Sequence, residues 1–282
     1  MNTSSAISDC SLRILFLGAI ALSSLLSGCG SSDESAKQLP TGPVEELYNN
    51  GVDALNARRF TAAADQFSAV EQNYPYSTWA VNAQLMSAYS LYLQNKYTEA
   101  LGTLDRFIQL HPAHRDIAYA YYLRALCYYE QIADIQRDQR GTAEAMNALR
   151  EVATRFPDTA YARDAQLKID LCFDHLAGKE MEIGRYYETQ KEYLAAINRF
   201  RTVVDNYQTT THVPEALHRL IECYLAVGLN DEAQRTAAVL GYNYPGSEWY
   251  RDSYALVTNS KDLPPDLRAT KGWFTQVVDS IF

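Results

Sequence analysis

Small and apolar residues recur along the chain with helical spacing, in pairs of segments separated by short polar breaks. Residues three and four positions apart lie on one face of a helix, so each segment predicts a helix with one buried face. In the first pair, such residues are followed by a closing proline: Gly51, Ala54, Ala63, Phe67 and Pro75. The pattern therefore predicts two helices that pack against each other.

This helix-pair pattern repeats about every 37 residues. Pro75 and Pro112 are 37 residues apart, whereas Pro112 and Pro157 are 45 apart because the third unit carries extra residues. Pro245 closes the fifth unit, and Gln208 takes the place of proline in the fourth. A period close to this length is typical of tetratricopeptide repeats. We predict an all-α fold class, a tetratricopeptide-repeat solenoid of five helix–turn–helix units over residues 44–257, with an extended helix in the fourth unit.

Two segments depart from the period. The third unit has ADIQRDQRGT, Ala133 to Thr142, between its helices, and the fourth unit begins with a long amphipathic run from Tyr161 to Glu188. Solenoids tolerate insertions in their loops and often use them for contacts with partners. Simple drift in loop length is the alternative for both segments.

A short phrase marks three of the junctions between units: EQNYPYSTWA, ATRFPDTAYA and LGYNYPGSEW. Proline disfavours helical geometry in the residue before it, so a helix must stop at each phrase. Two residues later, Ser77, Thr159 and Ser247 can cap the next helix by accepting a hydrogen bond from a free backbone N–H. The flanking aromatic residues would pack between successive units.

The cysteines follow the same period. Cys127, Cys172 and Cys223 each lie 15 residues after the closing position of the preceding unit, and Ser90 has the same place after Pro75. Equivalent positions on successive units should lie beyond disulfide reach. We therefore expect a buried small-residue position rather than a metal or redox site.

The N-terminal segment has the features of an export signal. Arg13 precedes an apolar run of 13 residues, Ile14 to Leu26, which is too short to span a bilayer. The run ends in LSGC, which is similar to a bacterial lipobox with Cys29 as the lipidated residue. A signal peptide followed by an unrelated cysteine is the alternative. We predict a lipoprotein signal peptide over residues 1–28 and a flexible linker over residues 29–43.

The expected lipid also predicts a location. The only cofactor that we expect is the covalent diacylglycerol and N-acyl lipid on Cys29, which would anchor the chain without a transmembrane helix. Gly30 stands where lipoproteins retained in the inner membrane have aspartate. By this analogy the chain is lipid-anchored in the inner leaflet of the outer membrane, on the periplasmic face.

Charge and motifs exclude several classes of function. The net charge is −9 without a run of Lys or Arg, which argues against nucleic acid as a partner. Phosphate-loop, dinucleotide-binding, nucleophile-elbow and zinc-protease motifs are absent, so we predict no enzyme and no metal site. His111 and His114 form HPAH, but His111 takes the aromatic place before proline. The other histidines are scattered without evident carboxylate partners: His175, His212 and His218.

The 21 tyrosines point to a binding surface instead. First helices of tetratricopeptide units line a concave surface, and tyrosine offers broad apolar area with a polar tip, which suits an extended peptide. The repeat positions that face this surface predict a groove for a substrate peptide, formed by Tyr48, Tyr89, Tyr92, Tyr119, Tyr122 and Tyr129. Ring packing in the seams between helices is the alternative.

The C-terminal tail, residues 258–282, resumes a helical pattern after Pro264 and Pro265. The apolar residues that share one face of this short amphipathic helix are Trp273, Val277, Val278 and Ile281. Docking on the repeats and a disordered tail are both open.

Several longer stretches resemble the BamD family of outer-membrane lipoproteins. They include LYNNGVDALNARRFTAAADQF, HPAHRDIAYAYYLRALCYYEQI, YARDAQLKIDL and HLAGKEMEIGRYYETQKEYLAAINRFRTVVDNYQTTTHVPEALHRL, and they cover most of the mature chain. The resemblance implies a periplasmic scaffold of the β-barrel assembly complex. Its implied partners are BamA, through the POTRA region, other Bam lipoproteins, and unfolded outer-membrane proteins.

The resemblance also assigns roles to parts of this sequence. It implies that the C-terminal units face BamA, with the arginine of NRF, Arg199, at the contact, and that the N-terminal units receive substrate signals that end in aromatic residues. A periplasmic tetratricopeptide adaptor in cell-envelope division or peptidoglycan synthesis is the alternative function. An enzyme with an appended repeat is a weaker rival, because the sequence contains no second domain.

Overall fold

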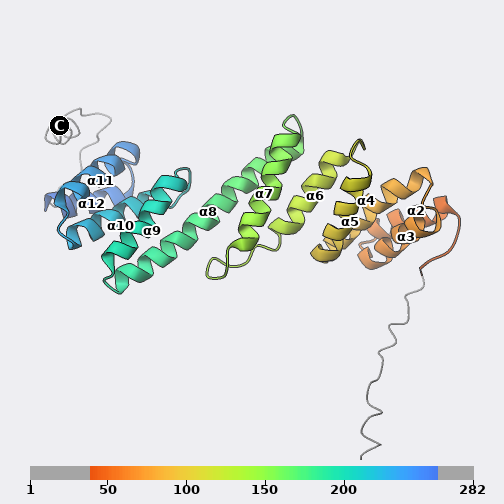
Figure 1. Ribbon diagram of the computed structural model, residues 1–282, viewed down its shortest axis with the longest axis horizontal. Coiled ribbons are helices and arrows are strands. Elements are labelled where there is room, and N and C mark those ends of the chain that lie inside the picture. The colour runs from red at the N-terminus through yellow and green to blue at the C-terminus, as the bar shows by residue number, and fades with distance from the viewer. Residues whose placement is uncertain (1–38, 260–282) are drawn as a thin grey trace, which may run out of the picture. The chain divides into compact units, whose positions relative to one another are not determined.

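The computed structural model describes residues 39–259, which contain eleven α-helices and no strand (Figure 1). The predicted signal peptide, Cys29, Gly30, most of the linker and nearly all of the C-terminal tail, with Trp273, lie outside the described residues. The helices are α2 (Val44–Asn56), α3 (Phe60–Asn73), α4 (Thr78–Leu93), α5 (Tyr97–Leu110), α6 (Ile117–Tyr129), α7 (Arg140–Arg155), α8 (Ala160–Thr189), α9 (Tyr193–Asn206), α10 (Val213–Ala226), α11 (Asn230–Asn243) and α12 (Glu248–Thr258).

Successive helices pack in pairs, as the repeat predicts. Each helix from α3 to α11 contacts the helix before it and the helix after it, and α2, α4, α6 and α8 also contact one another in order. We call α2, α4, α6, α8 and α10 the first helices, and α3, α5, α7, α9 and α11 the second helices. The predicted fold class, five tetratricopeptide units with an extended helix in the fourth, is confirmed.

Small residues on the first helices make room for large rings on the second helices. A Cβ atom on Gly51 would lie 2.7 Å from the Phe67 ring, and one on Gly184 would lie closer still to the Phe200 ring. Both rings are fully buried, and burying such a side chain contributes about 1.5–3 kcal/mol. The two glycines therefore have the same packing role in units one and four.

The junction phrases act as predicted. Ser77, Thr159 and Ser247 each accept a hydrogen bond from the backbone N–H of the next helix, at 3.1, 3.1 and 3.2 Å. The preceding helices stop before the aromatic residue that precedes each proline. α9 stops before Tyr207 in similar backbone geometry although Gln208 replaces the proline. Proline is therefore not required to end a unit.

The predicted small-residue position is also confirmed. Cys127, Cys172 and Cys223 are buried and free, and Ser90 is fully buried with its hydroxyl donating to the Met86 carbonyl at 2.8 Å. Burial raises the pKa of the Cys172 thiol to about 11 and those of the other two to about 12. All three thiols therefore stay protonated and unreactive near neutral pH.

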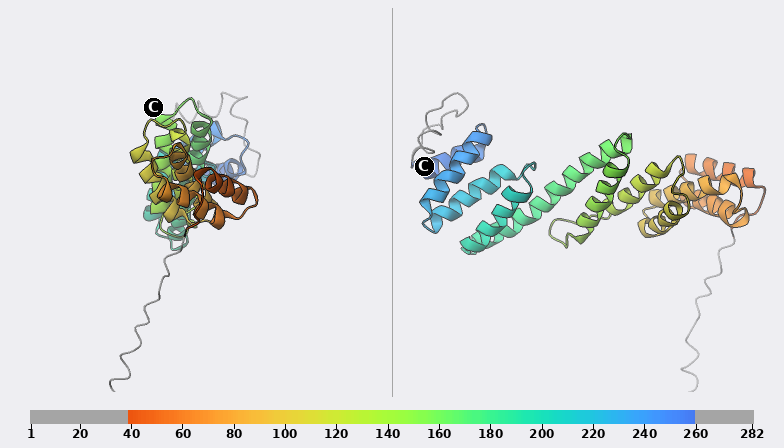
Figure 2. Two further views of the ribbon diagram at one scale, coloured as in Figure 1. Left: turned by 90° about the vertical axis from the view of Figure 1, so that its right-hand side faces the viewer. Right: turned by 45° about the horizontal axis from the view of Figure 1, so that its top comes forward.

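The long helix α8 belongs to two units. Its first half packs on α7 through Ala165, Ile169 and Cys172, and its second half packs on α9 through Met181. Figure 2 shows this helix continuing without a break from α7 to α9. No helix within residues 39–259 is long and apolar enough to cross a membrane.

The insertion in the third unit lies on the middle of α8. The Ala133 carbonyl is 2.9 Å from His175 Nε2, and the Gln136 carbonyl accepts a hydrogen bond from Lys179 Nζ at 3.0 Å. Ile135 Cδ1 would be 3.2 Å from a Cβ atom on Gly178. The loop therefore has a structural role, since it packs where α8 passes from one unit to the next.

Candidate binding surfaces

Three of the six predicted tyrosines lie in a chain of ring contacts across the first helices. Tyr89 on α4 and Tyr119 on α6 have ring centroids 6.5 Å apart. Tyr161 on α8 joins the chain at 5.6 Å from Tyr119 and 5.2 Å from Tyr122. We call Tyr89, Tyr119, Tyr122 and Tyr161 the tyrosine row. Its members are partly exposed, so each ring has one packed side and some area open to solvent.

The other three predicted tyrosines have separate surroundings. Tyr48 packs between Phe67 and Trp79, with ring centroids 5.4 and 4.9 Å away. The Tyr92 hydroxyl donates to the Glu130 carboxylate at 3.2 Å, and the Tyr129 ring lies 5.2 Å from Lys168 Nζ. The structure therefore brings three of the six predicted tyrosines into the tyrosine row. Tyr48, Tyr92 and Tyr129 make their own contacts outside it.

Burial raises the pKa of five of the six predicted tyrosines. Desolvation raises the pKa of Tyr119, and it raises the pKa of Tyr122 together with the hydrogen bond to Asp164, whose carboxylate accepts at 2.5 Å. Desolvation likewise raises the pKa of Tyr48, Tyr92 and Tyr129. The surface therefore offers aromatic area and neutral hydroxyls, which suit an apolar peptide better than an anionic one.

Sequence reasoning missed Tyr161 and Trp79 as parts of this surface, although the junction phrases contain them. In each phrase the last aromatic residue contacts a ring on the preceding first helix: Trp79 contacts Tyr48, Tyr161 contacts Tyr119, and Trp249 contacts His218. That recurrence within the repeat was the signal that could have found them.

Arg199 lies at the contact between α8 and α9. Its guanidinium donates to the Glu180 carboxylate at 3.1 Å, and 43% of its side chain remains exposed. Its neighbour in the structure is therefore an acidic residue 19 positions earlier, which the sequence pattern did not indicate.

The Arg219 guanidinium on α10 lies near three carboxylates at the junction of the fourth and fifth units. Its Nη1 lies 2.9 Å from Glu222 and 3.7 Å from Glu188, and its Nε lies 3.7 Å from Glu215. Burial raises the pKa of Glu188 to about 7, although Arg219 acts in the opposite direction. The cluster therefore contains a carboxyl group that titrates near neutral pH.

The expectation that three histidines lack carboxylate neighbours is wrong for two of them. His212 Nε2 lies 3.6 Å from Asp174 because the fold brings the start of α10 beside α8, and His218 Nε2 lies 3.6 Å from Glu222, four residues later on α10. His111 and His114 instead pack on the Phe107 ring. Among residues 39–259, no group of three or more potential ligands could hold a metal ion.

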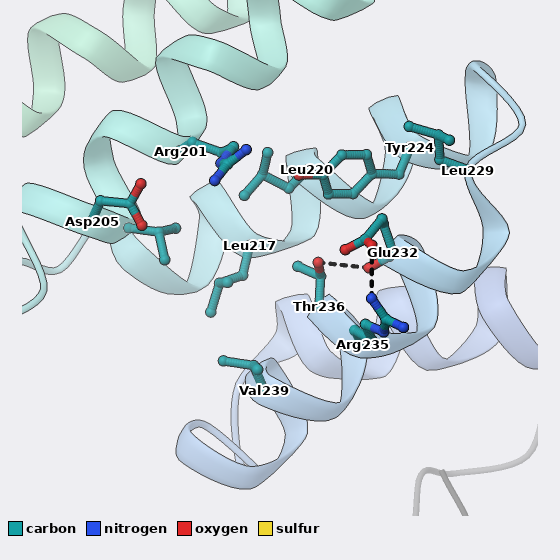
Figure 3. Close-up of a pocket in the computed structure, with 11 residues that line it drawn as sticks. Arg201, Asp205, Leu217, Leu220, Tyr224, Leu229, Glu232, Arg235, Thr236 and Val239 are labelled. Carbon is teal, nitrogen blue, oxygen red and sulfur yellow. Dashed lines mark hydrogen bonds and ion pairs between the residues drawn. The ribbon is translucent and has the colours of Figure 1, made fainter. Parts of the chain in front are cut away.

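A cavity of 470 Å³ lies between α9, α10 and α11 (Figure 3). Apolar Leu217, Leu220 and Val239 line it together with charged side chains. Arg235 Nη1 donates to the Glu232 carboxylate at 2.9 Å, and Arg201 and Asp205 line the α9 side. This amphipathic cavity was not predicted from the sequence.

The repeated helix pairs and the capped junctions define the class as a tetratricopeptide-repeat protein. The model of one family, YfiO, described as outer membrane lipoprotein, matches residues 40–240. The chain belongs to this family.

Curated relatives from several bacteria share the same name. The chain is 47% identical to "Outer membrane protein assembly factor BamD" of Caulobacter vibrioides over 90% of this chain and 84% of the relative, and 48% identical to that of Rickettsia prowazekii over 88% and 98%. The Neisseria meningitidis serogroup B protein of the same name is 33% identical over 87% and 95%. The resemblance to the BamD family is therefore confirmed.

Among solved structures, a thermophilic tetratricopeptide protein of Thermus thermophilus is similar over 77% of this chain and 100% of its own. Its identity is 19% and the TM-score is 0.36.

Proposed function

We propose that this protein is a non-enzymatic, outer-membrane-anchored periplasmic scaffold of the β-barrel assembly complex. In this role it binds the POTRA region of BamA and receives unfolded outer-membrane proteins for insertion. The observation that carries the proposal is its 47–48% identity, along most of the chain, to relatives named outer membrane protein assembly factors. The family description adds an association with the outer membrane.

The tyrosine row supports the substrate part of the proposal. It presents three rings from the predicted groove and Tyr161 on successive first helices. An unfolded barrel protein exposes alternating apolar and polar side chains, which such a surface can contact without strict sequence readout. The remaining predicted positions, Tyr48, Tyr92 and Tyr129, would extend the contact area.

The BamA part of the proposal rests on the fourth and fifth units. Arg199 keeps 43% of its side chain exposed. Arginine is enriched at protein interfaces. Arg199 would therefore contact an acidic group of BamA while it holds Glu180.

A pull-down from detergent-solubilised envelopes tests this function. With the tagged full chain as bait, we expect recovery of BamA, other Bam lipoproteins and barrel proteins in transit. Recovery of division or peptidoglycan-synthesis proteins without BamA would contradict the proposal and favour the alternative adaptor role.

A further inference from the structure

The cavity in Figure 3 lies at a place that recurs along the repeat. In each pair of neighbouring units, the first helix of the later unit packs against both second helices, as α10 packs against α9 and α11. Residues at equal distances from the closing positions of the units therefore stand at equivalent places. We call the cavity lined by Arg201, Val204, Leu220 and Val239, among others, the α9–α11 groove.

Between units one and two, polar side chains bridge the equivalent place. The Arg106 guanidinium on α5 lies 3.0 Å from the Glu71 carboxylate on α3. The hydroxyls of Ser68 on α3 and Ser87 on α4 lie 3.2 Å apart. An ion pair and a hydrogen bond within the chain therefore join these two units.

Between units two and three, an ion-pair network has the same position. Arg124 on α6 lies 3.3 Å from Asp105 on α5 and also pairs with Glu151 on α7. A hollow of 470 Å³ is present here too, but charged side chains, including Arg124, Glu144 and Glu151, line much of it. Polar contacts within the chain therefore occupy both of these places.

In the α9–α11 groove, apolar side chains stand at the bridging positions. Val204 and Val239 are equivalent to Glu71 and Arg106, and Leu220 has the place of the serine and the arginine in the other two grooves. Val204 is partly exposed and Val239 is 44% exposed. Valine and leucine have no hydrogen-bonding side-chain atoms and cannot form such a bridge. This groove therefore keeps apolar side chains open to solvent where the others have polar contacts.

Arg201 also differs from its equivalents because it lacks a partner. Ser68 and Asp105 make the contacts described above, and the Arg150 guanidinium lies 5.3 Å from the centre of the Phe173 ring. Arg201 is exposed and forms no ion pair with any residue from 39 to 259. Figure 3 shows its side chain extending from α9 toward α10. A carboxylate from outside the chain can therefore pair with it.

The walls of the groove carry charges of both signs. Asp205 lies one turn after Arg201 on α9 and likewise forms no ion pair with residues 39–259. Arg235 and Glu232 on α11 instead pair with each other at 2.9 Å. An anionic lipid headgroup would meet Asp205 and Glu232 as well as Arg201. Charge complementarity therefore favours an occupant that carries both an acidic and a basic group.

We propose that the α9–α11 groove docks an amphipathic helix of a partner protein. Apolar side chains of this helix enter the cavity, and an acidic and a basic residue one turn apart pair with Arg201 and Asp205. α9 and α11 have 14 residues each, which is about 21 Å, so a helix of similar length matches the groove. An amphipathic helix in an apolar groove is a recurring mode of recognition. This docking is separate from the contact proposed for Arg199 and does not depend on it.

Synthetic peptides titrated into the purified full chain test the proposal. The probe is a labelled 14-residue helical peptide with leucines at i, i+4 and i+7, bordered by glutamate and lysine one turn apart. Three matched peptides replace the leucines by serine, all charged residues by glutamate, or all charged residues by lysine. We expect fluorescence anisotropy to show that the mixed-charge peptide binds at least tenfold more tightly than the serine peptide. It should bind at least threefold more tightly than either single-charge peptide. Equal affinity for the three leucine peptides, or no binding of any, would overturn the proposal.

A double variant shows whether the peptide occupies this groove. Val204→Glu/Val239→Arg copies the bridge between Glu71 and Arg106, and we expect it to weaken the mixed-charge peptide at least tenfold. Tyr161→Ala, in the tyrosine row, is the control and should leave this affinity unchanged. The opposite pattern would overturn the proposal, because the peptide would then bind the tyrosine row.

A single variant keeps the test decisive if the double variant fails to fold by circular dichroism. Arg201→Glu should weaken the mixed-charge peptide about threefold or more, whereas Arg163→Glu, at an exposed arginine on α8 outside the groove, should not. Equal effects of the two variants would contradict the pairing with Arg201. Binding of the POTRA region of BamA is titrated separately, so loss of peptide binding alone would leave that proposal standing.

Discussion

At the scale of single residues, a substitution at Tyr161 is the most direct test of whether the tyrosine row binds peptide, because the Tyr161 ring contacts both Tyr119 and Tyr122. Tyr161→Ala removes the ring that joins α8 to α6. We expect it to weaken binding of a peptide from the last strand of a barrel protein about fivefold, or about 1 kcal/mol. Fluorescence anisotropy with a labelled peptide measures the change.

Tyr76→Ala is the matched control, because Tyr76 is fully exposed in the turn before α4 and outside the row. It should leave peptide affinity unchanged. If Tyr161→Ala lowers the melting temperature but binds peptide as well as the control, the row serves only to pack the seams between helices.

Glu188 makes stability depend on pH. Burial raises its pKa from 4.5 to about 7, so the folded state holds the proton more tightly than the unfolded state does. The stability gained from this proton is present below pH 4.5 and is lost as pH rises through 7. Glu188→Gln mimics the protonated form. We expect it to stabilise the protein by about 1–2 kcal/mol at pH 8, after allowance for screening, and much less at pH 5.

Urea unfolding of the wild type and the variant at both pH values measures this difference. Glu182→Gln, on the same helix, is the control and should show no such dependence. A Glu188→Gln variant that is destabilised equally at both pH values would show that the ion pair with Arg219 outweighs the burial of the carboxyl group.

The predictions for single residues were correct where the distance of a residue from the junction proline determines its role. The caps at Ser77, Thr159 and Ser247 and the buried thiols follow from spacing alone. The partners of Arg199 and Tyr122 do not follow from spacing, because Glu180 and Asp164 lie on a different helix. Side-chain pairing between helices depends on helix rotation and crossing angle, which a one-dimensional pattern leaves open.

At the scale of elements, the insertion of the third unit fixes α8 at its middle. Gly178 is the point of closest approach, because an added Cβ would lie 3.2 Å from Ile135 and 3.3 Å from His212. Gly102 lies in α5 with open space around it. We therefore expect Gly102→Ala to stabilise the protein by up to about 1 kcal/mol through helix propensity, and Gly178→Ala to gain clearly less.

Larger side chains should increase the difference in stability between variants at Gly178 and variants at Gly102. Gly178→Val must displace Ile135 or His212, so we expect it to cost about 1–3 kcal/mol, whereas Gly102→Val should be close to neutral. Thermal unfolding followed by circular dichroism measures all four variants. Equal effects at the two glycines would mean that the loop does not press on α8.

The elements themselves were largely predictable, because prolines, caps and small–large pairs recur with the period. The extended α8 was expected from its unbroken amphipathic run. Its division between two units was not, since the packing of Cys172 on α7 and of Met181 on α9 requires the positions of both neighbours. From the sequence, the insertion of the third unit could be a loop that contacts a partner or a simple change in loop length. Its contacts with His175 and Lys179 on α8 are visible only in the structure.

At the scale of the whole molecule, the lipid anchor that we predict on Cys29 would hold the protein at the membrane. Cys29→Ser prevents acylation, so we expect most of the protein to move from the membrane fraction to the soluble periplasmic fraction. Fractionation with immunoblotting measures the ratio. A variant that remains in the membrane fraction after a high-salt wash would contradict the anchor.

The central claim is that the fourth and fifth units bind the POTRA region of BamA, and titration calorimetry with the purified region tests it most directly. Besides the wild type, the titrations use Arg199→Glu and the double variant Arg199→Glu/Glu180→Arg, which restores the internal ion pair with reversed polarity. We predict that the wild type binds and that both variants bind at least tenfold more weakly. Recovery of affinity in the double variant would show that Arg199 only positions α9 against α8, and absence of binding by the wild type would contradict the central claim.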